Sequence, residues 1–297
     1  MDQNTTQSLD DILAALNTIN SSLSFAVYLP ISKKTVRFKQ MTTGQEKRIA
    51  KQLLVGDNKT IYSVLPEILQ ENCLDQQINI ENLSIIDFFC IILQTRIYSI
   101  GNQITIRTVK KSAIDTITKN KIKNKNIAVA TDVSVQDEAK TSQPDKKKTE
   151  KLDVKIDLIK IYESIVDTCK DHQNVSITID NCPYQIVCDI PSVKMIRNKN
   201  ETEDDNLISR LMKFVSELHL INPKTNETKK IDLSAFMPDE AKKIIENIPN
   251  QLLVKASEKI IDFYTLLTTI QLYKFKLGGT EYFQTINFLS LDFFTSF

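Results

Sequence analysis

The chain has 297 residues, of which 41% are hydrophobic, and its 38 basic residues nearly balance its 37 acidic ones. This composition supports one large or two ordinary folded domains, and a net charge of +1 excludes an overall field that would draw the protein to nucleic acid or an anionic membrane. With five Gly and two His, the sequence has none of the usual glycine-rich phosphate-binding motifs and few candidates for general acid–base catalysis.

Neither the N-terminal segment nor the most apolar segment is typical of an exported or membrane-spanning chain. Residues 1–17 are polar and acidic before they become amphipathic, unlike a signal peptide. The longest apolar run, residues 85–100, is interrupted by Asp87 and Arg96, so it predicts a buried helix and no membrane span. The five scattered cysteines then indicate reduced thiols in a cytosolic setting.

The chain begins with a predicted helix and a predicted β-hairpin. Residues 8–20 place Leu and Ile side chains on one stripe of an amphipathic helix. Residues 24–29 and 34–39 then alternate apolar and polar side chains, as half-buried strands do. Pro30 cannot donate to a strand ladder and ends the first strand. The short segment between the two runs predicts a hairpin.

Helices follow the hairpin. A capping-box pattern of Thr43 and Glu46 predicts the start of the next helix. Residues 58–71 predict another helix, in which Pro66 forces a break or a kink. Residues 83–97 are apolar on almost every face, and such a helix is normally buried. A returning strand completes the first half of the chain.

The composition changes at about residue 119. Residues 119–151 carry nine Lys and five acidic residues but no aromatic residue and no Gly. Low hydrophobicity, together with Lys residues interspersed with acidic ones, predicts a solvated, flexible linker. The sequence therefore divides into a hairpin-plus-helices domain over 1–118, the Lys-rich linker over 119–151, and a helix, hairpin and helix domain over 152–297 with an aromatic tail.

The second half predicts helices around a second hairpin. Helices are expected over 151–171, 205–219 and 250–275, and two alternating strands within 175–190 flank a turn at 180–183. The predicted fold class is α+β and mostly helical. Two helical halves each carry a small antiparallel β-hairpin or sheet, and the flexible charged linker joins them.

The best candidate for a metal or thiol site consists of Cys169, His172, Cys182 and Cys188, which are side chains of the types that bind zinc. On one extended strand, at ~3.3 Å per residue, Cys182 and Cys188 are roughly 20 Å apart, too far for one zinc ion unless the hairpin folds back between them. Cys169 and His172 share a helix face, but no third group or oxyanion hole is evident nearby. We therefore expect no metal, no cofactor and no catalytic residue, with a small zinc- or thiol-dependent protein as the alternative.

The C-terminal segment is rich in aromatic residues, which either pack on the chain's own core or contact a partner. A segment this apolar is an aggregation liability when it is exposed, and aromatic side chains also anchor protein–protein interfaces. Together with the first hairpin, this segment supplies the candidate partner-contact residues, which are Leu29, Pro30, Arg37, Lys39, Phe288, Phe293, Phe294 and Phe297.

Short segments spaced along residues 24–110 together form a recognisable pattern. They are Leu29-Pro30, the sequence VRFK, Thr-Gly-Gln-Glu-Lys from Thr43, VLPEILQENC ending at Cys73, Asp87, and TRIYSIG with Arg96, Ser99 and Gly101. In this order and spacing they resemble the baseplate hub subunit and baseplate hub assembly protein family of T-even-type phages.

The resemblance implies a non-enzymatic protein of phage tail morphogenesis. Such a protein is a component of the hub of a contractile-tail baseplate or a chaperone of hub assembly, and its partners are other baseplate hub or tail proteins. Its location is the virion baseplate or, during assembly, the host cytoplasm. A nucleic-acid-binding accessory protein that uses residues 119–151 is the remaining alternative. Because that segment lacks interleaved aromatic and Arg residues for stacking and base readout, we expect no nucleic-acid partner.

Overall fold

The computed structural model describes most of the chain as two compact units. The described residues are 8–55, 58–109, 151–179, 182–197, 207–222, 224–277 and 280–294. The first unit comprises residues up to 102, residues 157–271 and residues from 287, and the second comprises 103–156 and 272–286. Each unit thus takes segments from both sides of the predicted linker. Apart from Lys151, residues 119–151 lie outside the described part, and the division into domains 1–118 and 152–297 stays a prediction.

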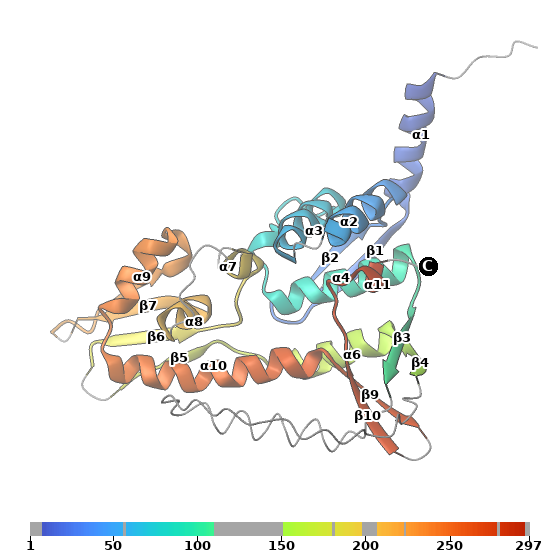
Figure 1. Cartoon of the computed structure of the whole chain (residues 1–297). Helices are drawn as coiled ribbons and strands as arrows, with labels where there is room; N and C mark the ends of the chain where they lie inside the picture. The colour runs from blue at the N-terminus through green and yellow to red at the C-terminus, as the bar shows by residue number, and fades with distance from the viewer. Residues whose placement is uncertain are drawn as a thin grey trace, which may run out of the picture. The chain divides into compact units, whose positions relative to one another are not determined.

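The α+β class, with mostly helical structure and small antiparallel sheets, is confirmed (Figure 1). The elements of the first unit up to its central helix are α1 (Leu9–Ser22), β1 (Ser24–Leu29), β2 (Lys34–Lys39), α2 (Thr43–Val55), α3 (Asn58–Asn72), η1 (Ile80–Asn82) and α4 (Ile85–Ser99). The second unit contains β3 (Gln103–Val109), β4 (Lys151–Asp157), β9 (Leu272–Leu277) and β10 (Thr280–Thr285). In it, β3 pairs with β4 and β9 pairs with β10.

The remaining elements of the first unit include a four-stranded sheet with the order β5-β6-β7-β8. They are α6 (Leu158–Cys169), β5 (Val175–Ile177), β6 (Tyr184–Cys188), α7 (Val193–Arg197), α8 (Leu207–Phe214), β7 (Val215–Ile221), β8 (Thr228–Asp232), η3 (Leu233–Ala235), α9 (Pro238–Glu246), α10 (Asn250–Ile270) and α11 (Leu291–Phe294). Strands β5 and β6 form the predicted second hairpin, and β7 and β8 extend it in antiparallel register.

The predicted first hairpin is confirmed. Strands β1 and β2 are antiparallel, with Phe25 opposite Phe38 and Val27 opposite Val36. These four side chains are buried, whereas the residues between them are exposed or half-buried. The hairpin therefore has one face in the core and one outer face, as the alternation in the sequence predicts.

Three predicted helices include residues that form strands. Residues 151–157 form β4, residues 215–221 form β7, and the last long helix ends at Ile270, before β9. In β4, Val154 and Ile156 are buried on either side of an exposed Lys155, a period of two that the helical interpretation overlooked. Because short apolar runs fit both periods, pairing with a neighbouring strand decides the outcome.

Two local details concern the residue that caps α2 and the proline within α3. The N-terminus of α2 is capped by Thr42, whose hydroxyl accepts the N–H of Gln45 at 3.3 Å while the Gln45 side chain accepts the N–H of Thr42 at 3.1 Å. The capping box therefore lies one residue before the predicted Thr43–Glu46 pair. Helix α3 is one continuous element with Pro66 inside it.

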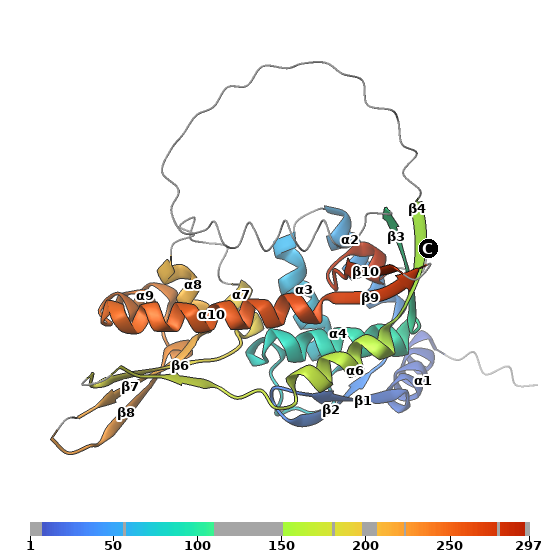
Figure 2. The ribbon, with the colours of Figure 1, turned by 90° about the horizontal axis from the view of Figure 1, so that it is seen from below.

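Helix α4 forms the centre of the first unit's N-terminal part. Every residue from Ile85 to Arg96 is buried, which confirms the prediction of a helix enclosed on all faces. It packs against β1 and α6, and Figures 1 and 2 both show α4 and α6 side by side. Ser84 caps its start by accepting the N–H of Asp87 at 3.1 Å.

The C-terminal end of α4 is joined to the end of the chain through Arg96. The Nε–H of Arg96 donates to the carbonyl of Phe293 at 2.7 Å, and Nη1 donates to the carbonyl of Gly101 at 2.6 Å. The carbonyl of Arg96 itself accepts the N–H groups of Ile100 and Gly101, at 3.0 Å each. Gly101 has a φ of 141°, which L side chains rarely adopt. One buried cation thus closes the helix and binds the tail.

We expect Arg96→Ala to lower the free energy of unfolding by about 2–4 kcal/mol, because two carbonyl groups lose a charged donor. Urea denaturation followed by circular dichroism measures the change. Arg37→Ala, which removes an exposed Arg of β2, is the matched control and is expected to change stability by less than about 0.5 kcal/mol. Equal losses for the two variants would contradict this role of Arg96.

Candidate interaction surface

The turn of the first hairpin is held by a buried carboxylate. Asp87 of α4 accepts the N–H of Ile31 at 2.9 Å, and the N–H and O–H of Ser32 at 3.0 and 2.6 Å. Lys33 has a φ of 52°, so the backbone turns back directly after these contacts. Burial raises the pKa of Asp87, although the hydrogen bonds from Ser32 and Ile31 act in the opposite direction. Helix α4 therefore determines where the hairpin tip lies.

The outer edge of β1 is covered by a tyrosine of α6. The hydroxyl of Tyr162 accepts the N–H of Tyr28 at 2.9 Å and donates to its carbonyl at 3.0 Å. Burial raises the pKa of Tyr162 to about 12, so this hydroxyl keeps its proton at neutral pH. Both backbone groups of Tyr28 are thus satisfied by one side chain.

The outer edge of β2 is covered by the segment after α3. The carboxylate of Asp75 accepts the N–H of Arg37 at 3.0 Å, and the N–H of Leu74 donates to the carbonyl of Arg37 at 2.9 Å. Phe38 also forms an isolated bridge with Cys73. With both edges engaged at these positions, the hairpin offers a partner its outer side chains and not its backbone.

The outer face of the hairpin presents two of the four predicted contact residues of this region. Arg37 is exposed and Lys39 is half-buried, whereas Leu29 and Pro30 are buried. Beyond the strand, the N–H of Met41 donates to the hydroxyl of Ser99 at 2.8 Å, so α4 also holds the chain where it leaves β2. The accessible cationic side chains therefore lie on a strand fixed at its tip, edges and exit.

The predicted contact residues of the tail lie in the core. Phe288, Phe293 and Phe294 are buried; the ring of Phe288 lies 5.1 Å from that of Phe89, and Phe293 meets Phe288 edge-on at 5.7 Å. Of the two uses that the sequence left open for the tail, the structure shows packing on the chain's own core. A partner contact through these residues stays a prediction, and Phe297 lies outside the described residues.

The four candidate metal ligands lie at the end of α6 and around β6. Cys169 is the last residue of α6 and His172 follows in the next turn; half-buried Cys182 precedes β6, and buried Cys188 ends it. Within the part of the chain that the structure describes, no three His, Cys, Asp or Glu side chains are grouped to hold a metal ion.

The chemistry of these groups favours a packing role. Burial raises the pKa of Cys169 to about 11 and that of Cys188 to about 12, and the thiolate is the form that ligates metals and attacks electrophiles. The Nε2 of His172 lies 3.1 Å from the Asp189 carboxylate, and its ring meets Phe263 edge-on at 5.8 Å. The His–Asp pair thus links the turn after α6 to the end of β6 and to α10.

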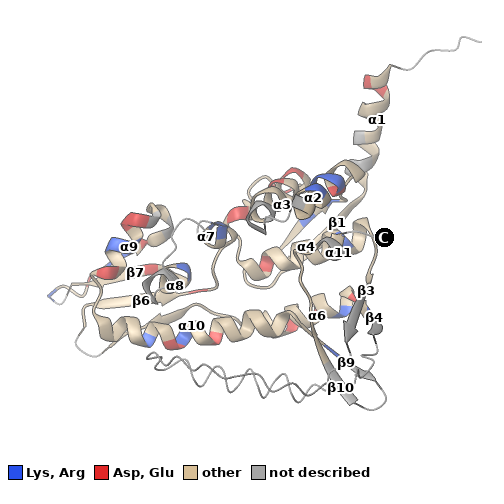
Figure 3. Ribbon diagram, in the orientation of Figure 1, with Lys and Arg blue, Asp and Glu red and all other residues tan. Residues whose placement is uncertain are grey.

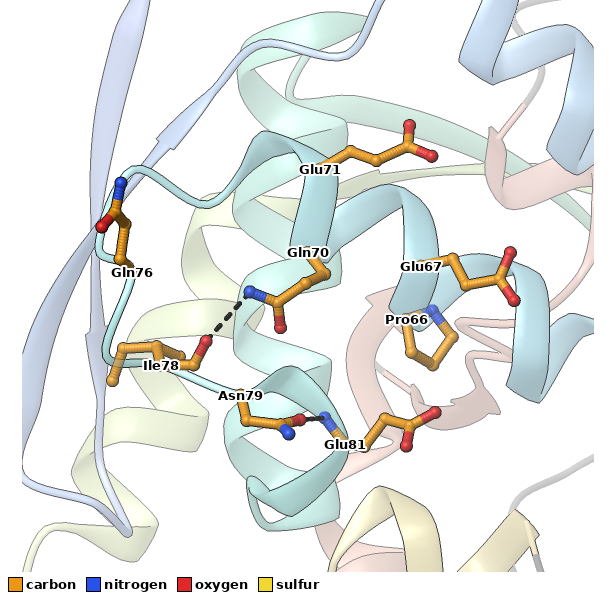
Figure 4. Close-up of a pocket in the computed structure, with 8 residues that line it drawn as sticks. All are labelled: Pro66, Glu67, Gln70, Glu71, Gln76, Ile78, Asn79 and Glu81. Carbon is orange, nitrogen blue, oxygen red and sulfur yellow. Dashed lines mark hydrogen bonds between the residues drawn. The ribbon is translucent and has the colours of Figure 1, made fainter.

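An open groove of about 750 Å³ lies between α3 and the segment leading into η1 (Figure 4). It is lined by Pro66, Glu67, Gln70, Glu71, Gln76, Ile78, Asn79 and Glu81. The three carboxylates are each paired: Arg48 lies 3.7 Å from Glu67 and 3.0 Å from Glu71, and Arg197 pairs with Glu81. Gln70 donates to the carbonyl of Ile78 at 2.9 Å. The Gln70–Ile78 contact links the two walls of the groove, and the two Arg side chains offset two of its three negative charges.

Sequence reasoning did not identify the residues that cover the edges of the hairpin. Tyr162 is one of several polar positions on an amphipathic helix, and Asp75 follows a helix in a polar segment. Neither type of position differs from an ordinary solvated one until the fold brings it to a strand edge.

Among the described helices, none is long and apolar enough to cross a membrane.

The chain matches a known protein family over most of its length. A family model described as "T4 bacteriophage base plate protein" matches residues 22–271. The matched range starts at the last residue of α1 and ends directly after α10, so it contains the hairpin, α4 and the residues that hold them. Neither the curated proteins nor the solved structures contain a match to this chain.

The raised pKa of Asp87 predicts a pH dependence of stability. Between about pH 4, the ordinary value for an Asp, and its higher folded value, the folded chain keeps a proton that the unfolded chain has released. This group therefore makes stability fall as pH rises through that window. We expect Asp87→Asn to remove this part of the decline.

Urea unfolding at a series of pH values from about 4 to 7 checks the prediction. Asp171→Asn, which alters an exposed carboxyl in the turn after α6, is the control and is expected to leave the profile parallel to that of the wild type. A parallel profile for Asp87→Asn as well would show that Asp87 does not contribute to the decline.

Proposed function

Because the chain belongs to the T4 bacteriophage base plate protein family, we propose that it builds the hub of a phage baseplate, as a hub component or as a chaperone of hub assembly. It acts by binding other baseplate hub or tail proteins and not by catalysis. The observation that carries this proposal is the family match over residues 22–271, which includes each element that positions the hairpin.

The geometry of the hairpin supports a role in binding. Its backbone is held by Asp87 at the tip, by Tyr162 along one edge and by Asp75 along the other. A face held in this way loses little conformational entropy when a partner binds. On this outer face Arg37 is exposed, and Lys39, two residues farther along β2, is half-buried. The surface that meets it on another baseplate protein is therefore acidic.

The chemistry of the candidate catalytic groups supports a non-enzymatic protein. The thiols of Cys169 and Cys188 are buried with raised pKa values, His172 is packed between Asp189 and an aromatic ring, and the carboxylates of the groove beside α3 are paired with Arg side chains. Each group is already engaged in packing or pairing. The protein is located in the virion baseplate as a hub component, or in the host cytoplasm during assembly as a chaperone.

Interrupting the gene in the phage that encodes it is expected to stop tail assembly before the baseplate is complete. Electron microscopy of the lysate and an infectivity count measure the effect, and supplying the gene from a plasmid is the control. Normal, infectious tails without the protein would overturn the proposal. Mass spectrometry of purified virions and of lysate then separates the two roles, because a hub component is found in both and a chaperone only in the lysate.

Reversing the charge of the hairpin face is expected to weaken binding to the other baseplate proteins. The double variant Arg37→Glu, Lys39→Glu should reduce co-purification with them by at least about tenfold, since like charges then oppose an acidic partner surface. Lys34→Glu, at the exposed turn end of β2, is the matched control, and unfolding curves verify that all variants fold. Undiminished co-purification of a folded double variant would show that this face is not the contact.

A further inference from the structure

Helix α1 has an apolar stripe that no part of the described chain covers. Leu9, Ile12, Leu16, Ile19 and the following Leu23 are between 43% and 70% exposed. The helix begins with a capping box, in which the hydroxyl of Ser8 accepts the N–H of Asp11 at 3.1 Å. A 14-residue helix is only marginally stable in water without a packed face. Its stripe therefore requires a partner.

The stripe has the spacing of a coiled-coil seam. Leu9, Ile12, Leu16, Ile19 and Leu23 follow one another at intervals of three, four, three and four residues, which places them at heptad positions a, d, a, d and a. Every a position is Leu and every d position is Ile. In parallel coiled coils this combination favours three or four strands over two.

The distribution of charge on α1 favours association with copies of itself. Its two acidic residues, Asp10 and Asp11, lie in the first turn, and Figure 3 shows α1 with acidic residues near one end. In the heptad they occupy the outer positions b and c. The flanking positions e and g carry no charged residue; Leu13, Ala15 and Ser22 are among them. Identical helices that lie in parallel thus meet no like-charge repulsion at the seam, and small or apolar residues widen the contact.

The width of the stripe also fits more than two chains. Leu13, at position e beside the seam, is 48% exposed as well, so the apolar surface of α1 extends past positions a and d. Each helix of a three- or four-stranded bundle contacts two neighbours, so its stripe is enclosed on both sides. The helix also lies outside the matched range of the baseplate family model except for Ser22, and the argument is independent of that match.

We propose that α1 joins copies of this chain into a parallel three- or four-stranded coiled coil. The partner of the exposed stripe is the same stripe of other copies, with Leu16 in the central layer of the seam. The chain then presents its other surfaces, the hairpin face included, in as many copies as the bundle has strands.

Sedimentation equilibrium and light scattering of the full chain test the proposal. The expected mass is three or four times 33.9 kDa, depending on protein concentration. Leu16→Asp should weaken association by at least about a hundredfold, because it places one charge from every copy in the central apolar layer of the seam. Ala14→Asp adds the same charge at position f, on the opposite side of the helix, and should leave the mass unchanged.

A variant of identical chain mass, in which Leu and Ile change places along the stripe, tests the packing itself. Exchanging the residues as Leu9→Ile, Ile12→Leu, Leu16→Ile, Ile19→Leu and Leu23→Ile places Ile at a and Leu at d, the combination that favours two strands. The expected mass is that of two copies. A wild-type chain that sediments as a single copy at its highest soluble concentration, or a Leu16→Asp variant with the wild-type mass, would overturn the proposal, as would an exchanged variant with an unaltered mass.

Discussion

Three polar side chains of one buried helix hold the backbone of three separate segments. Asp87 accepts hydrogen bonds from the hairpin turn, Ser99 accepts one from Met41 after the hairpin, and Arg96 donates to the tail at Phe293. A buried polar group without a partner costs about 1–3 kcal/mol, so each of these side chains specifies where its segment lies. The apolar surface of α4 drives burial, and its polar residues select one arrangement among those that bury the same area.

This arrangement explains how a chain with little candidate catalytic chemistry is suited to assembly. The hairpin is held at its tip by Asp87 and along its edges by Tyr162 and Asp75, and it presents side chains on a fixed strand pair. Helix α1 differs, because its apolar stripe is exposed and is completed by association. In the proposed assembly, the hairpin face is fixed within each chain, whereas the apolar stripe of α1 is buried only when copies associate.

Part of the fold follows from patterns within single segments. The alternation in residues 24–29 and 34–39 predicts the first hairpin, and the apolar faces of residues 83–97 predict α4. Residues 151–157 and 215–219, which the sequence predicts as helix, form strands, because their apolar spacing fits both periods and pairing between distant strands decides between them. The same limit applies to Tyr162, whose role at β1 depends on the packing of α6.

The sequence by itself determined the α+β class, the first hairpin, the buried helix and the family, and its motif contains Asp87, Arg96 and Ser99. Only the tertiary structure decided what these polar residues bind and whether the aromatic tail is core or surface. Patterns along a chain report burial and period, which are local properties. The partner of a buried charge or of a strand edge is a residue far away in sequence, such as Phe293 for Arg96 or Tyr162 for Tyr28, and folding alone brings the two together.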